Sequence, residues 1–146
     1  MSQDFVVRLF MCGLLSVSAL SCTAECSEKE SESFDFCLPR FSSEKPFAIE
    51  RTRLPLTVLK WVDELDIEGR TVTEPFKYAL SLSEYWHWPT LNEYMSSNEL
   101  NSRVIATSKT AVILDLYKDG YAKTVSYRFE SSNGCWFLTQ YQDKPI

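Results

Sequence analysis

Residues 110–141 read TAVILDLYKDGYAKTVSYRFESSNGCWFLTQY, and this stretch decides the fold. In its middle part, apolar and polar residues alternate with the period of two that is typical of a strand with one buried face. Asp119-Gly120 and Asn133-Gly134 divide the stretch, and both dipeptides favour the positive-φ turns of tight hairpins. The stretch therefore predicts an antiparallel meander, with strands over 110–118, 121–130 and 135–141.

An apolar pattern with helical spacing precedes these strands. Its residues recur at i, i+3, i+4 and i+7, as in a helix that turns one side toward a sheet. They are Phe34, Cys37, Leu38 and Phe41. Because Pro39 lies inside the pattern, we expect the helix to kink or to start near it, and Pro46 to end it. Helices packed on a curved antiparallel sheet give an α+β fold class.

Further elements are expected between these two patterns. Residues 54–62 predict a buried strand, 63–69 a turn, 70–73 a short returning strand and 103–107 an additional strand. Residues 81–88 admit two interpretations. Ser81 with Glu84, and Thr90 with Glu93, have capping-box spacing, which predicts two short helices. A strand is predicted instead by the alternation of apolar residues at Leu80, Leu82, Trp86 and Trp88.

The negative charge of the chain is concentrated near its N-terminus. Residues 25–36 carry −4 of the net −5, and the chain from Cys37 onward has 13 basic against 14 acidic residues. Nucleic-acid binding requires clustered Lys and Arg that displace counterions from phosphates, and no such cluster occurs, so no nucleic acid is expected as a partner. With 146 residues, 45% of them hydrophobic, we expect a single α+β domain over residues 34–146.

The first residues have the pattern of an export signal. Residues 9–20 form an apolar run that suits a signal peptide and is shorter than the roughly 20 residues of a membrane-spanning helix. We expect residues 1–21 to be removed. Residues 18–22, SALSC, resemble a bacterial lipobox, which predicts a lipid on Cys22 and a periplasm-facing envelope lipoprotein. Simple cleavage, giving a soluble periplasmic or secreted protein, is the alternative. Residues 22–33 are rich in Ser and Glu and predict a tether.

Five cysteines are present, of which Cys12 would leave with the signal peptide. If Cys22 carries a lipid, one of the remaining three stays unpaired; if it does not, four cysteines allow three connectivities. We expect a disulfide between Cys37 and Cys135, which lie in apolar surroundings far apart in the sequence, because an exported compartment permits oxidation. Two buried thiols are the alternative. No pair has the Cys-x-x-Cys spacing of redox or zinc sites.

A resemblance to a known family is carried by the residues Phe34, Cys37, Phe41, Glu44, Phe47, Arg51, Leu54, Pro55 and Leu56. Their spacing resembles the signature Phe-x-x-Phe-x-x-x-Phe-x-x-Asp-x-x-Phe-Gln-x-x-Arg-x-x-Phe-Pro-Leu of small bacterial envelope lipoproteins of unknown function. The chain departs from this signature at Cys37, Ala48 and Leu54, and by Pro39 inside the helix.

That family is similar in fold to the nuclear-transport-factor-2-like superfamily, a cone of helices wrapped by a curved antiparallel sheet. Residues 127–138 resemble the last two strands of the cone. The resemblance implies this fold and an envelope location. It leaves the activity open, because the superfamily carries isomerases, dehydratases and binding modules on one scaffold. Relatives in the superfamily often dimerise through the sheet face, so the resemblance also implies a possible homodimer.

Arg51 is the charged residue of this signature, and it lies between apolar positions. We expect it to pair with Glu44 or with another carboxylate at the end of the first helix, which would hold helix and sheet in register. The alternative is that Arg51 points into the cone and binds an anionic ligand, since a guanidinium grips carboxylates bidentately.

Residues 85–88, Tyr85-Trp86-His87-Trp88, form a dense aromatic cluster around the only histidine of the chain. In one interpretation Trp86 and Trp88 fill the core and His87 lies outside. In a second, the cluster is a platform that binds a ligand or partner, because such rings dominate interface energetics. In a third, His87 is catalytic together with an aspartate.

Groups for metal or cofactor binding are scarce, so none is expected. The acidic residues 63–68 lack the spacing of an EF-hand, and four glycines build no phosphate-binding loop. The sequence therefore favours a non-enzymatic envelope binding protein whose partner is a protein or a small ligand, for example an immunity or inhibitor lipoprotein. The alternative is a small cone-pocket enzyme of isomerase or dehydratase type, with His87 or Asp115 as general base and Tyr117 or Tyr127 as hydrogen-bond donor.

Overall fold

The computed structural model describes residues 26, 29–121 and 123–145. The predicted signal peptide and Cys22 lie outside these residues. The elements, in chain order, are α1 (Phe34–Ser43), α2 (Lys45–Glu50), β1 (Thr52–Leu65), β2 (Thr71–Leu80), α3 (Leu82–Trp86), α4 (Leu91–Asn98), β3 (Asn101–Ser108), β4 (Ala111–Tyr117), β5 (Lys123–Ser132) and β6 (Cys135–Pro145). None of the helices in this part of the chain is long and apolar enough to cross a membrane.

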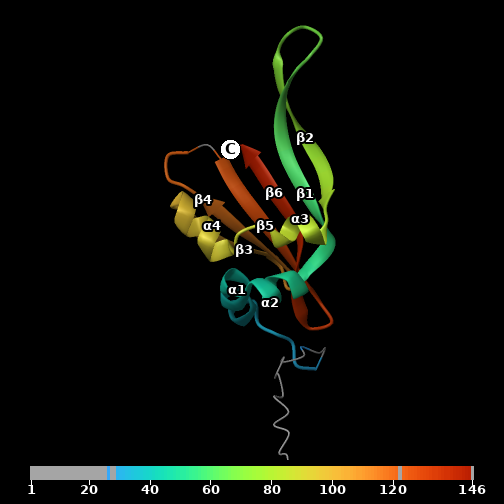
Figure 1. Ribbon diagram of the computed structural model, residues 1–146, viewed down its shortest axis with the longest axis vertical. Helices are drawn as coiled ribbons and strands as arrows, with labels where there is room; N and C mark the ends of the chain where they lie inside the picture. Colours follow the sequence, from blue (N-terminus) through green and yellow to red (C-terminus); the bar gives the residue numbers. More distant parts are fainter. Residues whose placement is uncertain (1–25, 27–28, 122, 146) are drawn as a thin grey trace, which may run out of the picture.

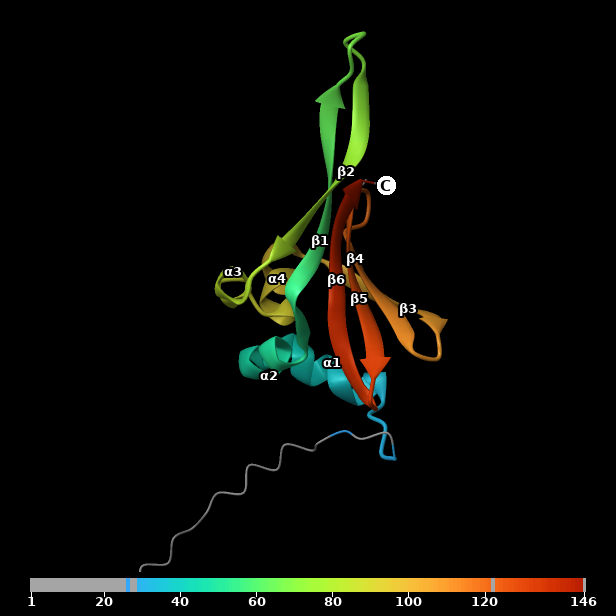
Figure 2. The ribbon, with the colours of Figure 1, turned by 90° about the vertical axis from the view of Figure 1, so that its right-hand side faces the viewer.

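The six strands form one curved, unclosed sheet in the order β2-β1-β6-β5-β4-β3 (Figure 1). The predicted meander β4-β5-β6 is confirmed, and β3 adds the expected strand at its edge. All neighbours are antiparallel except β1 and β6, which run parallel where the N-terminal hairpin meets the meander. Helices α3 and α4 lie on one side of the sheet, while α1 and α2 close one end of it (Figure 2). The predicted α+β fold class is confirmed.

The core lies between α1 and the sheet. Phe129 on β5 is fully buried, and the rings of Phe34 and Phe41 on α1 meet it edge to face, with centroids 5.2 and 4.9 Å away. Leu114 on β4 and Leu138 on β6 are buried on the same side of the sheet. The apolar stripe predicted for the first helix is therefore the face that packs on the strands.

The prolines act differently from what the sequence suggested. Helix α1 starts at Phe34 and runs through Pro39, which is exposed. The proline leaves the carbonyl of Asp35 without a helical donor, but Asp35 is also exposed, so water can reach this part of the helix. Pro46 does not end a helix; it lies in the first turn of α2, where a missing N–H costs nothing because that group has no helical partner.

The secondary structure of residues 81–88 is determined by the capping boxes. The Ser81 hydroxyl accepts from the Glu84 N–H while the Glu84 carboxylate accepts from the Ser81 N–H, and Thr90 and Glu93 do the same at α4. The helical interpretation is confirmed, and the strand alternative is wrong. The preceding strand β2 is longer than predicted. Its residues are exposed up to Ala79, and Glu74 and Pro75 interrupt the alternation of Val72, Phe76 and Tyr78; an edge strand tolerates Pro75.

The hairpin of β1 and β2 projects beyond the rest of the sheet (Figure 1). Pairing of β1 with β6 ends at Lys60, whereas pairing with β2 continues to Leu65. We call residues 61–75 the arm. Leu65, Ile67 and Val72 on the arm have exposed side chains.

The described part of the predicted tether is attached to the domain. The Glu32 N–H donates to the Gly134 carbonyl at 2.8 Å, and the Trp136 indole N–H donates to the Glu32 carbonyl at 3.0 Å. Cys26 forms a disulfide with Cys135, with their Cα atoms 5.3 Å apart. The domain therefore includes residues before 34, because these polar residues find backbone partners in the β5–β6 hairpin.

The predicted Cys37–Cys135 disulfide is wrong. Cys37 lies on the buried face of α1 and is a free thiol, while Cys135 at the start of β6 is bonded to Cys26. Burial raises the pKa of the Cys37 thiol to about 12, with a smaller contribution from the Glu32 carboxylate. The thiol therefore stays protonated, and a buried protonated thiol is inert toward oxidation.

We expect the Cys26–Cys135 disulfide to contribute roughly 2 to 5 kcal/mol to the free energy of unfolding, because it joins residues far apart in the chain. A reductant should lower the thermal unfolding midpoint of the mature protein, and Cys26→Ser should lower it by a similar amount and remove the effect of the reductant. Cys37→Ala is the matched control and should keep that effect. If the reductant no longer lowers the unfolding midpoint of Cys37→Ala, the Cys37–Cys135 pairing predicted from the sequence would be supported instead.

Candidate functional site

A pocket of about 180 Å³ opens between the helices and the strands β5 and β6. Its walls are Trp88, Pro89, Tyr94, Tyr127 and Tyr141. We call it the aromatic pocket. Four of its five residues carry aromatic rings, and they come from the loop after α3, from α4 and from two neighbouring strands.

The strand register places two of these rings side by side. Tyr127 on β5 is paired directly with Tyr141 on β6, so both side chains project from the same face of the sheet. Phe129, two residues from Tyr127, lies in the core on that face. The ring centroids of Tyr127 and Tyr141 are 5.2 Å apart, with an angle of 81° between the planes.

Trp88 is held over Tyr141 by contacts at the C-terminal end of α3. The Lys45 ammonium donates to the carbonyls of Tyr85 (2.9 Å) and Trp88. The Tyr85 carbonyl also accepts from the Trp88 N–H at 3.1 Å, so the Lys45 ammonium adds a favourable charge at this end of the helix. Trp88 then meets Tyr141 at a centroid distance of 4.9 Å and 70°, and Tyr85 at 5.6 Å. Burial lowers the pKa of Lys45.

The phenol hydroxyls of Tyr127 and Tyr141 are neutral donors at physiological pH. Burial raises the pKa of Tyr127 and of Tyr141, and the nearby Tyr94 adds to both shifts. Tyr94 and Tyr141 also share a side-chain hydrogen bond. The pocket therefore offers aromatic surface together with hydroxyl groups that can donate or accept a hydrogen bond.

A larger cleft of about 340 Å³ adjoins the aromatic pocket and shares Tyr94 with it. The other residues lining the cleft are Asn98, Leu100, Leu116, Lys118, Tyr121 and Val125. The Lys118 ammonium bonds to the Glu99 carboxylate at the rim. The cleft is thus more polar than the aromatic pocket.

The predicted cluster 85–88 is divided between two surroundings. Trp88 lines the aromatic pocket, and Tyr85 is buried behind it. Trp86 is 58% exposed, and His87, the C-cap of α3, is exposed as well. The short helix turns successive residues to different sides, so the four side chains do not form one platform.

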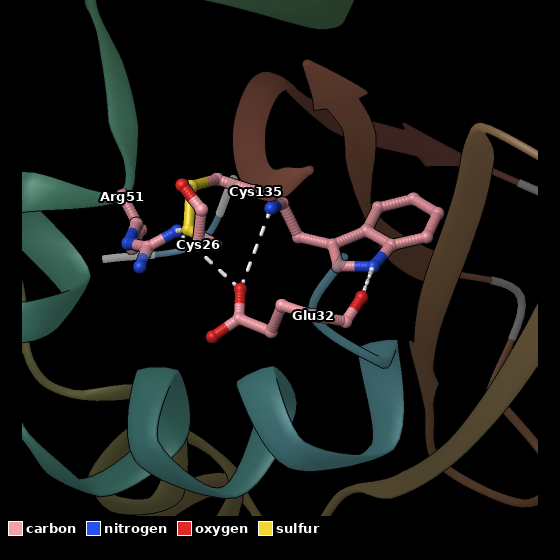
Figure 3. Close-up of a disulfide and its surroundings, with 5 residues drawn as sticks. Cys26, Glu32, Arg51 and Cys135 are labelled. Atoms are coloured by element: carbon pink, nitrogen blue, oxygen red, sulfur yellow. Dashed lines mark hydrogen bonds and ion pairs between the residues drawn. A yellow bond between two sulfur atoms is a disulfide. The ribbon is translucent and has the colours of Figure 1, made fainter. Parts of the chain in front are cut away.

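Arg51 lies beside the disulfide and does not line the aromatic pocket (Figure 3). Its guanidinium donates to the Glu32 carboxylate at 3.3 Å and to the Cys26 sulfur at 2.9 Å. Both partners of the ion pair are largely buried, with 7% of the Arg51 and 16% of the Glu32 side chain exposed. The predicted pairing with Glu44 is wrong, because Glu44 bonds to Arg40 one turn earlier on the helix. The carboxylate that Arg51 meets precedes the first helix instead of ending it.

The residues that the sequence suggests for an enzymatic mechanism do not lie together at the aromatic pocket. Tyr127 lines it, but His87 faces solvent. Asp115 alternates with the buried Leu114 and Leu116 and so projects from the opposite face of the sheet. There its carboxylate accepts from Arg103 at 3.1 Å and from the Ser126 hydroxyl at 2.6 Å. Tyr117, two residues further on, shares that opposite face.

No group of three or more His, Cys, Asp or Glu side chains in the described residues is arranged to hold a metal ion. Trp88 is the member of the aromatic pocket that the sequence singled out for binding. Tyr94 and Tyr141 were missed. The hairpin register over Asn133-Gly134 alone would place Tyr127 opposite Gln140, and a register shift between Arg128 and Phe129 brings Tyr141 to that position instead.

Comparison with solved structures identifies the fold. A nuclear-transport-factor-2-like protein from Bacteroides fragilis superposes on the chain with a TM-score of 0.57 at 20% identity, over 80% of this chain and 49% of that one. The chain thus spans about half the length of that protein. A second such protein is from Shewanella baltica and has an unknown function. It matches with a TM-score of only 0.34 at 10% identity, over 76% of this chain and 85% of that one, and no conclusion is based on this match.

No protein-family model matches the sequence, and no curated protein matches it. The fold is nuclear-transport-factor-2-like, as the resemblance implied. Membership of the envelope lipoprotein family stays a prediction.

We expect the buried Arg51–Glu32 pair to matter for stability. Glu32→Gln leaves the guanidinium buried without its counter-charge, which should lower the free energy of unfolding by about 3 kcal/mol. Glu44→Gln is the matched control, because it removes the same charge from an exposed pair and should change stability little. Urea unfolding of both variants measures the difference. Equal effects would show that the Arg51 contact is no stronger than a surface ion pair.

Proposed function

We propose that the chain is an exported binding protein of the cell envelope, tethered by a lipid on Cys22, that takes its ligand in the aromatic pocket. The observation that carries this proposal is the meeting of Trp88, Tyr94, Tyr127 and Tyr141 around one open space. Aromatic walls with a few polar groups are typical of ligand-binding sites.

The construction of the pocket supports binding. Tyr127 and Tyr141 are fixed by strand register, and Trp88 by the Lys45 contact. Helix α4 begins at a capping box whose N-cap, Thr90, lies four residues before Tyr94. Each ring is therefore held in place by contacts that do not depend on a ligand. A preformed site loses little conformational entropy when a ligand binds.

The Cys26–Cys135 disulfide supports export, because disulfides persist in oxidising compartments and are rare in the cytosol. It also shortens the proposed tether. Four residues of extended chain span at most roughly 14 Å, so a lipid on Cys22 would keep Cys26 close to the membrane. The arm lies at the end of the molecule opposite to residues 29–33 (Figure 1) and would then point away from the membrane.

An immunity or inhibitor lipoprotein is one form of such a protein. Its partner would be a protein that contacts the exposed Trp86 on α3. Large exposed aromatic residues are frequent anchors of protein interfaces. The two forms differ in which tryptophan they require: Trp88 for a ligand inside the pocket and Trp86 for a protein at the surface of α3.

Native mass spectrometry of protein purified gently from its own host tests the proposal. We expect a retained small molecule that is lost in Trp88→Ala and kept in Trp86→Ala. A retained protein lost in Trp86→Ala would support the immunity or inhibitor form. An adduct that survives both substitutions would place the site elsewhere and overturn the proposal.

The anchor is tested separately by cell fractionation. Cys22→Ala removes the only atom that can accept the lipid, so the protein should move from the membrane fraction to the soluble fraction. Ser21→Ala, which keeps a small residue before the cysteine, is the control and should leave the protein in the membrane fraction. A soluble wild-type protein would refute the lipid anchor and would leave the proposed ligand binding in the aromatic pocket unaffected.

A further inference from the structure

We propose that the aromatic pocket is a cage for a quaternary ammonium group, such as the trimethylammonium of choline or a betaine. This inference rests on the proposed binding function and names the chemical class of its ligand. It is carried by the angles between the rings, by the size of the pocket and by the charges around it.

The ring geometry favours a rounded group over a flat one. Tyr141 stands at 81° to Tyr127 and at 70° to Trp88, both edge-to-face contacts, so Tyr141 forms a corner with each of these rings and is stacked parallel to neither. Tyr94 lines the pocket from α4. A planar aromatic ligand stacks best on parallel faces, whereas a tetrahedral group with four carbon substituents presents similar surface in every direction. Rings at steep angles can surround such a group.

The size of the aromatic pocket agrees with this shape. Its volume of about 180 Å³ is below the roughly 300 to 1,000 Å³ typical of sites for whole drug-sized ligands. The pocket therefore suits one compact group, and the rest of a longer ligand would extend into the adjoining cleft that shares Tyr94.

The charges around the pocket favour a cation without N–H groups. The faces of Trp and Tyr rings carry negative charge density and attract cations within about 6 Å. Asp143, two residues after Tyr141 on β6, lies on the same side of the sheet, and its negative charge contributes to the raised pKa of Tyr141. A methylated ammonium needs no hydrogen-bond acceptors, so it matches a pocket whose walls are mostly aromatic rings. A primary ammonium has three N–H groups and would find only the tyrosine hydroxyls in exchange for its water.

Two neighbouring cations are held by other partners, and a third is exposed. Lys45 donates to two backbone carbonyls behind the pocket, and Lys118, in the adjoining cleft, bonds to Glu99. Lys60 on β1 is paired in register with Asp143 and is exposed. None of these three lines the aromatic pocket.

Binding of matched soluble probes tests the cage. Choline and its neutral isostere 3,3-dimethylbutan-1-ol have the same shape and differ in the charge, so calorimetric titration separates a cation site from a merely apolar one. We expect choline to bind at least tenfold more tightly than the isostere. Equal binding of the two, or no binding of choline, would overturn the inference.

Variants locate the effect in the rings. Tyr141→Phe retains the ring and should keep choline affinity within about threefold, whereas Tyr141→Leu should lose at least tenfold. Trp86→Leu is the matched control, because Trp86 is an exposed tryptophan outside the pocket, and this variant should bind choline like the wild type. Equal losses in Tyr141→Phe and Tyr141→Leu would show that the hydroxyl, and not the ring, is recognised, and would refute the cage.

The source of the cation is distinguished by a second probe. Glycerophosphocholine is a fragment of a lipid headgroup and carries the same trimethylammonium group as choline. If it binds more tightly than choline, the natural ligand is a lipid headgroup; if it binds more weakly, the natural ligand is a free small molecule. Both outcomes support the cage. Failure of this inference is distinguishable from failure of the proposed function. A retained ligand that requires Trp88 and is not displaced by choline leaves the binding function intact and rules out the cage alone.

Discussion

The contact of Phe34 and Phe41 with Phe129 is the interaction on which the rest of the structure depends. It joins the first helix to the middle of the meander, and all three rings are buried in one aromatic cluster. Since side chains alternate along a strand, turning Phe129 toward the helix also turns Tyr127 toward it. Register then brings Tyr141 beside Tyr127. The same contact that fixes the core thereby sets two walls of the aromatic pocket.

A second group of contacts holds the end of the molecule where the chain enters the domain. Glu32 lies next to the N-cap of α1, accepts from Arg51 and, through its carbonyl, from the Trp136 indole. The Trp136 ring in turn meets Phe34 at 5.2 Å. Because the disulfide ties Cys26 to the residue before Trp136, the polar segment is fixed to the core at two successive residues of β6. A segment that is too polar to fold alone is ordered by the hairpin beside it.

The sequence predicted those parts of the fold that depend on local patterns. The meander followed from period-two alternation and two glycine turns, and both capping boxes followed from the spacing of Ser or Thr and Glu. The cysteine pairing could not be predicted in this way. Residues 22–33 carry too few apolar groups to suggest packing, so Cys37, which lies in an apolar pattern, seemed the better partner for Cys135. The bond instead depends on long-range contacts of Glu32 that no local pattern encodes.

The aromatic pocket as a whole escaped prediction for a related reason. Trp88 belongs to a dense local cluster, and Tyr127 was named only as a hydrogen-bond donor of the alternative enzyme, whereas Tyr94 and Tyr141 were missed. The three tyrosines are separated by many residues. Each has an ordinary local role, on a helix or on the inner face of a strand. Only the closing of the sheet against α4 gathers them. The site therefore depends on the tertiary arrangement of several elements, which is consistent with a scaffold that supports many different functions.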